Sequence, residues 1–276
     1  MTSKNQLTNI LICTIIRNQE KTIKKWHSQI KQLVKQNKVI KFGVSVYEND
    51  SSDKTKELLK KLSFKFVKKH TITSENINTK FFGSVSKAER LINLSNARNI
   101  CIIQAIHKDK YDYIIFIEPD IKYNVKRMSK LINKVIKSDY NFDIVSPVSL
   151  NSNNHFYDKW ATRKNKFTEY WYPKEFKQGL IKLYSTFSCF CIYNAKPIYK
   201  GLTFAPYNPR LKKYDCDTAV ICENFQSKGY TNIFMDTDYF VLHPDRPTKS
   251  ILNNKQIRRL YDYLIHIIFY KLRKVN

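Results

Sequence analysis

The first half of the chain alternates short apolar runs with segments of helical spacing. The runs Asn9–Ile16, Val39–Tyr47 and Tyr113–Ile117 are too short for helices and rich in strand-forming residues. Between them, Lys21–Lys35 and Thr55–Leu62 repeat apolar residues at helical intervals. A strand that is regularly followed by a helix is typical of βαβ units, in which consecutive strands lie parallel. We therefore predict an α/β fold with a mostly parallel central sheet and flanking helices.

The remaining elements follow from the same patterns, and the rhythm changes after Leu150. A capping box at Ser86 to Glu89 predicts a helix that continues to about Ile106. The further strands are expected at Phe64–Val67, Asp143–Val148, His155–Arg163, Tyr184–Tyr193 and Ile233–Leu242, and the further helices at Met128–Ile136, Thr218–Phe225 and Leu260–Leu272. The second half is therefore expected to be mixed, with the whole sheet belonging to one Rossmann-like domain.

Composition limits the cellular setting and the partners. The 276 residues carry a net charge of +26, which favours an anionic partner, although the lysines are spread along the chain as on an ordinary solvated surface. The six cysteines include no Cys-x-x-Cys pair, which indicates a reducing compartment. No segment has the apolar length of a signal peptide or of a membrane span of ~18 residues. We expect a cytoplasmic protein.

Two carboxylates follow the buried strand predicted at Tyr113–Ile117. Glu118 and Asp120 stand after Tyr113–Ile117, separated by a proline. Ligands of open α/β sheets bind at the carboxyl ends of the strands. Carboxylate oxygens there suit Mg²⁺ or Mn²⁺, which bind phosphate oxygens in turn. The alternative is a solvated turn.

Polar residues also follow the other strands. Arg17 ends the first strand, and Glu48 and Asp53 follow the second, where they are able either to hold a nucleoside or to form a turn and helix cap. Arg90 and Arg98 lie on the helix that begins near Ser86, where they bind phosphate or form surface salt bridges. Their convergence on one crevice favours the binding role.

The second half offers residues for an acceptor. Asp158 and Arg163 have groups that grip hydroxyls, and Trp160 has an apolar face for a sugar ring. Tyr157, Trp171 and Tyr172 offer similar faces, although core packing is the alternative for such aromatics.

The motifs and their order resemble those of GT-A-type glycosyltransferases, and within that fold the fungal capsule-associated α-1,3-mannosyltransferase-like family. The resemblance extends over most of residues 9–245. It is carried by VSVYENDSSDKT (44–55), ERLINLSNARN (89–99), YIIFIEPDIKY (113–123), HFYDKWATR (155–163), YSTFSCFCIYNA (184–195) and DCDTAVICENFQSKGY (215–230).

The resemblance implies roles for individual residues in the donor half. Glu118 and Asp120 take the place of the Asp-x-Asp metal motif, with Glu in the first position. Glu48 matches the acid that contacts the nucleotide, and Arg98 the arginine near its pyrophosphate.

In the acceptor half, Asp217 matches the acid before a helix that acts near the acceptor, and Asp215 competes for that assignment. Asp217 is either a helix cap or a base that takes a proton from the acceptor hydroxyl. His243 resembles the C-terminal metal-binding histidine, since an imidazole ligates Mn²⁺ well; the alternative is a hydrogen-bonded histidine at a strand end.

These expectations define a metal-dependent hexosyltransferase. It would move a sugar from a UDP- or GDP-sugar to a hydroxyl of a glycan or glycoconjugate, with Mn²⁺ or Mg²⁺. Residues 1–256 form the GT-A-like domain, with a nucleotide-sugar half at 1–150 and an acceptor half at 151–256. The basic helix at 257–276 either packs on the domain or touches a membrane peripherally.

Three other function classes stay open at this stage. The positive charge also fits a nucleic-acid-binding protein, although no nucleic-acid motif is present and none is expected as a specific partner. A nucleotidyltransferase and a non-catalytic sugar-binding domain are the other two. The sequence leaves the donor sugar, the base, the acceptor, the oligomeric state and the stereochemical course open.

Overall fold

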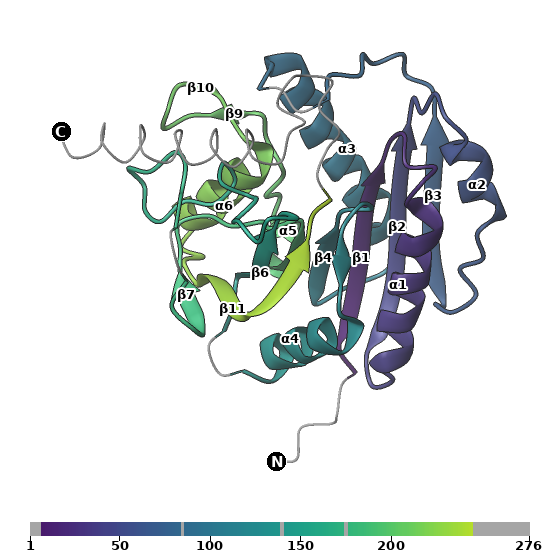
Figure 1. Cartoon of the computed structure of the whole chain (residues 1–276), viewed down its shortest axis with the longest axis horizontal. Coiled ribbons are helices and arrows are strands. Elements are labelled where there is room, and N and C mark those ends of the chain that lie inside the picture. The colour runs from purple at the N-terminus through teal and green to yellow at the C-terminus, as the bar shows by residue number, and fades with distance from the viewer. Residues whose placement is uncertain (1–6, 84–85, 139–140, 174–175, 245–276) are drawn as a thin grey trace. The chain divides into compact units, whose positions relative to one another are not determined.

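The computed structural model describes residues 7–83, 86–138, 141–173 and 176–244. Within them, a nine-stranded sheet is flanked by helices (Figure 1). The strands are β1 (Asn9–Ile16), β2 (Lys41–Asn49), β3 (Lys69–Glu75), β4 (Tyr113–Ile117), β5 (Lys122–Tyr123), β6 (Ile144–Leu150), β7 (Leu180–Lys182), β8 (Phe190–Asn194) and β11 (Ile233–Leu242), with a separate hairpin of β9 (Tyr207–Asn208) and β10 (Lys213–Tyr214). The helices are α1 (Ile23–Gln36), α2 (Thr55–Lys61), α3 (Ala88–Ile106), α4 (Val125–Lys137), α5 (Ala195–Tyr199) and α6 (Asp217–Ser227).

Alternate residues of the buried strands divide the core into two layers. Ile10 and Ile12 of β1 pack with α1, α2 and α4, and Figure 1 shows α1 and α4 in front of the strands. Leu11 and Cys13 face the other way and pack with α3, α5 and α6. Because both faces are covered, the central strands are apolar throughout, which is why they could be recognised in the sequence.

The order of the strands brings distant segments to one edge. The order is β3-β2-β1-β4-β8-β6-β11-β5, and β1 to β4 are parallel. β8 is antiparallel to both β4 and β6, and β11 is parallel to β6. The carboxyl ends of β4 and β11 therefore lie at the same edge, together with the amino end of β8.

Several sequence predictions about local structure are wrong. Residues 64–67 form a turn and not a strand, and the side chains of Phe64 and Val67 in this turn are buried. The strand that pairs with β2 is the polar edge strand β3, which follows this turn. His155–Arg163 is not a strand and makes only isolated bridges at Phe156 and Arg163. Tyr184–Tyr193 is a strand only from Phe190, and α3 has no side-chain cap at its start, so the capping box does not form.

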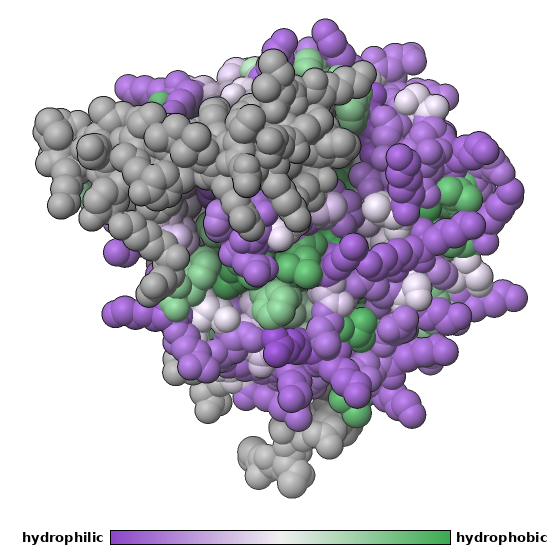
Figure 2. Space-filling view, in the orientation of Figure 1, coloured by the Kyte–Doolittle hydropathy of each residue, from purple (hydrophilic) through white to green (hydrophobic). Residues whose placement is uncertain are grey.

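Other predictions are confirmed or fall outside the described residues. All six cysteines are buried and free. Among the described residues, none of the helices has both the length and the apolar character needed to cross a membrane. The face seen in Figure 2 is mostly hydrophilic, as the lysine-rich composition indicates. A compact unit ends at His243, while the helix expected at Leu260–Leu272 and the boundary at residue 256 lie outside the described residues.

Asp50, in a left-handed conformation just after β2, organises the loop after β3. Its carboxylate accepts hydrogen bonds from the backbone N–H groups of Ile77 (2.8 Å), Asn78 (2.9 Å) and Thr79 (2.9 Å). Burial alone would raise the pKa of Asp50, but the hydrogen bonds from Thr79 and Asn78 outweigh it and hold the pKa below its ordinary value. The ionised form therefore stabilises the folded state.

We predict that Asp50→Asn lowers the free energy of unfolding by about 2 kcal/mol at pH 7, because an amide replaces a charged acceptor. A carboxyl group whose pKa is lowered by folding stabilises the folded state at pH values above its unfolded-state pKa of about 4. This stabilisation is lost as the pH falls below that value. The difference between wild type and variant in urea unfolding should thus shrink from pH 7 to pH 3. Asp238→Asn, at an exposed position, is the control; a pH-independent difference would contradict the assignment.

Candidate functional site

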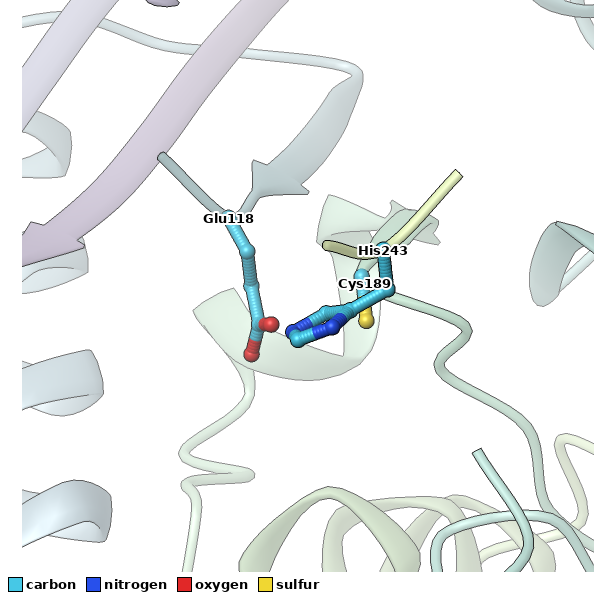
Figure 3. A group of neighbouring side chains, drawn as sticks. All are labelled: Glu118, Cys189 and His243. Atoms are coloured by element: carbon cyan, nitrogen blue, oxygen red, sulfur yellow. The ribbon is translucent and has the colours of Figure 1, made fainter. Parts of the chain in front are cut away.

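Three side chains from distant segments meet at the shared edge of the sheet. Glu118 follows β4, Cys189 precedes β8 and His243 follows β11, and one ligand atom from each lies within 4.8 Å of the others. Figure 3 shows the three side chains pointing toward one another. The strand directions explain the meeting, since an antiparallel strand brings its beginning to the edge where parallel strands end.

Asp120 joins this cluster through β5. β5 pairs antiparallel with the end of β11, which places Asp120 Oδ2 3.5 Å from His243 Nε2. The ring of Tyr157 stacks on the buried His243 imidazole, with centroids 3.7 Å apart and planes 10° apart. The imidazole is therefore held in a fixed orientation toward the two acids.

The donor set fits a hard or borderline divalent cation. Carboxylate oxygens and an imidazole nitrogen are ligands that Mn²⁺ takes, and carboxylates alone suit Mg²⁺. Burial, with the nearby charge of Glu118, raises the pKa of the Cys189 thiol well above its ordinary value. Glu118, Asp120 and His243 are the sequence-predicted metal ligands; the fold brings Glu118 and Asp120 each close to His243, and Cys189 completes the group with Glu118 and His243. Sequence reasoning missed Cys189, because only the direction of β8 reveals its place.

Arg98 lies next to this cluster, buried among phenylalanine rings. Its guanidinium carbon is 4.7 Å from the centroid of the Phe187 ring, and the side chain is 5% exposed. Nε donates to Asp217 Oδ2 at 2.8 Å, and Nη2 lies 3.7 Å from Glu118 Oε1. Burial works against the charge, but the carboxylates of Asp217 and Glu118 outweigh it and raise the pKa of Arg98. Arg98 thus connects the predicted metal site with the start of α6.

A strained turn supports the same cluster. Ser188 and Cys189 have φ values of 53° and 60°, a left-handed conformation that costs roughly 1–3 kcal/mol for a residue other than glycine. Ser188 N–H donates to Asp158 Oδ2 at 2.6 Å, and Glu118 N–H donates to the Cys189 carbonyl at 2.9 Å. Burial, together with the charge of Glu118, raises the pKa of Asp158 to about 7. Asp158, which is half-buried, therefore holds the turn next to Cys189.

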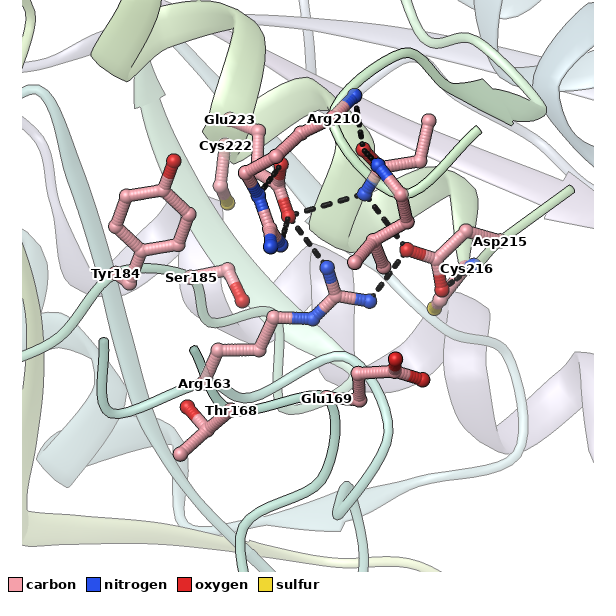
Figure 4. Close-up of polar contacts among 12 residues, drawn as sticks. Arg163, Thr168, Glu169, Tyr184, Ser185, Arg210, Asp215, Cys216, Cys222 and Glu223 are labelled. Carbon is pink, nitrogen blue, oxygen red and sulfur yellow. Dashed lines mark hydrogen bonds and ion pairs between the residues drawn. The ribbon is translucent and has the colours of Figure 1, made fainter. Parts of the chain in front are cut away.

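The other predicted acceptor residues form a separate buried network (Figure 4). Arg163 is fully buried; it donates to Asp215 Oδ2 at 2.6 Å and to Glu223. Asn208 donates to the same two carboxylates, at 2.8 Å and 3.1 Å, and Arg210 donates to Glu223 at 2.9 Å. Arg163 and Asp215 therefore face each other within the fold, where they fix the β9–β10 hairpin to α6.

Asp217 and Trp160 occupy the border between the two groups. Asp217 is the first residue of α6 and pairs with Arg98, whereas Asp215, two residues earlier, belongs to the buried network. Trp160 Nε1 donates to Asp215 Oδ1 at 3.2 Å. Of the two competing acids, Asp217 is thus the one that pairs with Arg98, which also forms an ion pair with Glu118.

The predicted nucleotide-binding residues lie at the ends of β1 and β2 and largely hold loops. Glu48 is buried and accepts from Ser51 N–H at 2.9 Å and from Ser74. Asp53 accepts from Glu20 N–H at 3.1 Å and from Thr55 N–H at 2.9 Å.

The two remaining arginines hold neighbouring loops. Arg17 donates to the Thr79 carbonyl at 2.6 Å, and Arg90 donates to the Gly83 carbonyl at 2.6 Å. These hydrogen bonds place both arginines at the loops that follow β3.

A cavity of about 320 Å³ opens beside the end of β2, against α3. Its wall combines carboxamides with apolar side chains. The lining residues are Tyr47, Asn49, Ile77, Asn93, Asn96, Ala97, Asn99, Ile100 and Ile103. Asn49 is the residue directly after Glu48, so the cavity lies where the sequence predicts the nucleoside. The sequence signal that was missed is the repeat of asparagines along α3.

Comparison with known proteins agrees with this architecture. Residues 9–219 match the family described as Cryptococcal mannosyltransferase 1. No curated protein matches the chain significantly. Among solved structures, S. aureus TarS 1-349 in complex with UDP-GlcNAc is similar with a TM-score of 0.55 and 14% identity, over 92% of this chain and 65% of that one.

The complex of TarS 1-349 with UDP gives a TM-score of 0.53 and 15% identity, over 87% of this chain and 61% of that chain. The chain thus spans less than two thirds of the length of these TarS structures. The likeness shows that the domain has the GT-A fold, as the sequence motifs predict.

We predict that Arg163→Met lowers the free energy of unfolding by about 3–5 kcal/mol, because it leaves the buried Asp215 without a cation and Glu223 with Arg210 alone. Urea unfolding followed by circular dichroism measures this change. Arg210→Met, at a side chain that is 30% exposed, is the matched control and should cost about 1 kcal/mol or less.

The combined variant Arg163→Met, Asp215→Asn, Glu223→Gln should recover most of the lost stability, since it removes the uncompensated charges together with the arginine. A loss below about 1 kcal/mol for Arg163→Met alone would contradict a central role of this network.

Proposed function

Because the chain belongs to the cryptococcal mannosyltransferase 1 family, we propose that it is a glycosyltransferase that moves a sugar from a nucleotide diphosphate sugar to a hydroxyl of a glycan or glycoconjugate. The observation that carries the proposal is the group of Glu118, Cys189 and His243 at the carboxyl edge of the sheet, with Asp120 next to His243 and the buried charge of Arg98 next to Glu118. This is the edge at which α/β sheets bind their ligands.

Mn²⁺ or Mg²⁺ is the proposed cofactor, held by Glu118, Asp120 and His243. When bound, such a cation offsets the negative charge that develops on a diphosphate leaving group. Glu118 forms an ion pair with Arg98 on one side and faces His243 on the other. Its carboxylate is therefore oriented before any ligand binds. Nη1 of Arg98 makes no hydrogen bond within the described chain, which leaves an N–H pair for a diphosphate oxygen.

The nucleoside is proposed to bind at the end of β2. Glu48 holds the turn at Ser51 and the edge strand at Ser74, so its role is to shape the loop. Asn49 lines the adjacent cavity and presents the amide that a base or ribose would meet. The S. aureus TarS structures of the same fold contain UDP and UDP-GlcNAc, which supports a nucleotide-sugar donor.

The acceptor is proposed to approach from the second half, so residues 1–150 bind the donor and residues 151–256 the acceptor. Asp217 accepts a hydrogen bond from Arg98, and Arg98 also forms an ion pair with Glu118. This position suits a carboxylate that orients the acceptor hydroxyl or takes its proton. Asp158 and Trp160 lie at the same border, while Arg163 and Asp215 support it from within.

We predict that Asp120→Asn weakens Mn²⁺ binding at least tenfold, because it replaces a charged ligand with a neutral one; changes in metal sites commonly have about this size. Electron paramagnetic resonance of Mn²⁺ measures the affinity without requiring turnover. The same variant should lose metal-dependent donor hydrolysis, assayed across UDP- and GDP-sugars with and without Mn²⁺.

Asp238→Asn is again the matched control, since this exposed acid on β11 lies outside the cluster. Full Mn²⁺ affinity and full turnover in Asp120→Asn would rule out the proposed metal site. Absence of hydrolysis of every donor by the wild-type protein would count against the proposed function itself.

A further inference from the structure

Three aromatic side chains from two loop segments stand in a row. The ring centroids of Trp160 and Tyr170 are 6.4 Å apart with planes at 16°, and those of Tyr170 and Tyr172 are 6.3 Å apart with planes at 29°. Each of the three is half-buried, so part of each side chain remains accessible. We call this row the aromatic ladder.

Trp160 packs against a core cluster, whereas the two tyrosines extend the ladder away from it. Trp171, which lies between the two tyrosines in sequence, turns the other way and packs against Phe156 and Phe176, at centroid distances of 5.8 Å and 5.7 Å. This alternation puts Tyr170 and Tyr172 on the side of Trp160. Neither tyrosine belongs to the described core clusters, and both are half-buried.

Contacts outside the three rings fix the ladder. Trp171 N–H donates to the Lys159 carbonyl at 2.9 Å, which holds the two segments side by side. Lys159 Nζ lies 5.2 Å from the centroid of the Tyr172 ring, and Glu169 pairs with Lys213 of β10 at 2.6 Å. The rings are thus preorganised by their supports, which reduces the entropy lost when a ligand binds.

The Trp160 end of the ladder is connected to the residues around Asp217. Trp160 donates to Asp215, which the buried Arg163 holds. Asp217 follows two residues later and pairs with Arg98. The row therefore starts next to the proposed acceptor carboxylate and continues through Tyr170 to Tyr172.

The chemistry of the ladder matches a carbohydrate. One face of a sugar ring carries C–H bonds whose partial positive charge is attracted to the negative face of an aromatic ring. Lys159 and the tyrosine hydroxyls are available to hydrogen-bond with the hydroxyl groups at the edge of the sugar. Nucleic-acid bases also stack on aromatic rings, so oligonucleotides are included in the test below.

We propose that the aromatic ladder binds successive sugar rings of the acceptor, so that the acceptor is an oligosaccharide chain and not a single sugar or a small alcohol. This inference rests on the proposed glycosyltransferase function and adds the acceptor class to it. Trp160 receives the ring nearest to Asp217, and Tyr170 and Tyr172 receive the rings further along the chain.

The first experiment measures glycan binding without catalysis. The full chain is titrated against mannose, glucose and N-acetylglucosamine oligosaccharides of one to six rings by saturation-transfer NMR. Wild-type affinity should rise with chain length over the first few rings. Tyr172→Ala and Tyr170→Ala should each weaken binding of the longer chains about fivefold, and together about 20-fold, while binding of single sugars is unchanged.

Two variants serve as matched controls. Tyr172→Phe keeps the ring and should retain most of the affinity. Phe167→Ala removes an aromatic side chain that is 83% exposed in the same loop but outside the ladder, and it should have no effect.

Several outcomes would overturn the inference. These are failure of any oligosaccharide to bind the wild type, affinity that does not depend on chain length, and equal loss in Phe167→Ala and Tyr172→Ala. Tighter binding of oligo-dT or oligo-U than of any glycan, lost in the tyrosine variants, would assign the ladder to nucleic acid.

Donor hydrolysis without acceptor separates this inference from the proposed function. The tyrosine variants should hydrolyse the donor at the wild-type rate, because the ladder is not part of the donor site. If the wild type hydrolyses a donor but the tyrosine variants leave the KM for long acceptors unchanged, the ladder assignment fails alone. If the wild type hydrolyses no donor, the proposed function fails.

Discussion

The buried guanidinium of Arg98 is the charge on which the arrangement of the domain depends. A cation that is 5% exposed must be paired, since an unpaired charge in the interior is far too costly. Arg98 comes from α3 in the first half, and its two carboxylate neighbours are Glu118 after β4 and Asp217 on α6. Keeping that pairing fixes the proposed donor edge relative to the proposed acceptor helix, which lies 119 residues away from Arg98 in sequence.

The second buried arginine explains why the irregular part of the chain holds its shape. Residues 151–173 and 200–216 contain few regular hydrogen-bonded elements, so side chains must order them. Arg163 draws together Asp215, Glu223 and, through them, Asn208 at the start of the hairpin. The planar fork of the guanidinium directs one nitrogen to each carboxylate in a fixed geometry. The stacked rings beside Trp160 then have a rigid support.

Prediction from sequence was most accurate for the strands whose position depends on local residue chemistry alone. β1 and β4 lie at the predicted residues, because runs such as Tyr113–Ile117 are apolar on both faces and end in polar side chains. The edge strand β3 was missed because its alternating residues are mostly polar, while Phe64 and Val67 serve the core from a turn. Only the pairing with β2 makes a strand of that segment.

The same division applies to the candidate site. Glu118 and Asp120 follow a buried strand, so their position could be predicted from the end of that strand. His243 could be placed only through family resemblance, because its approach depends on β11 being parallel to β4 across two intervening strands. The burial of Arg163 and Asp215 was unpredictable, since their pairing spans 52 residues and both look like exposed polar groups in sequence.

The strained turn at Ser188 and Cys189 joins the fold to the site. Two successive left-handed residues, neither of them glycine, reverse the chain so that β8 enters antiparallel to β4. The backbone bond from Glu118 to Cys189 and the bond from Ser188 to Asp158 hold this turn. Strain of this kind persists only where the surroundings over-determine it, as they do at functional sites. The turn that starts β8 therefore also sets the backbone of Glu118, and the position of the proposed metal ligand follows from the packing of the sheet.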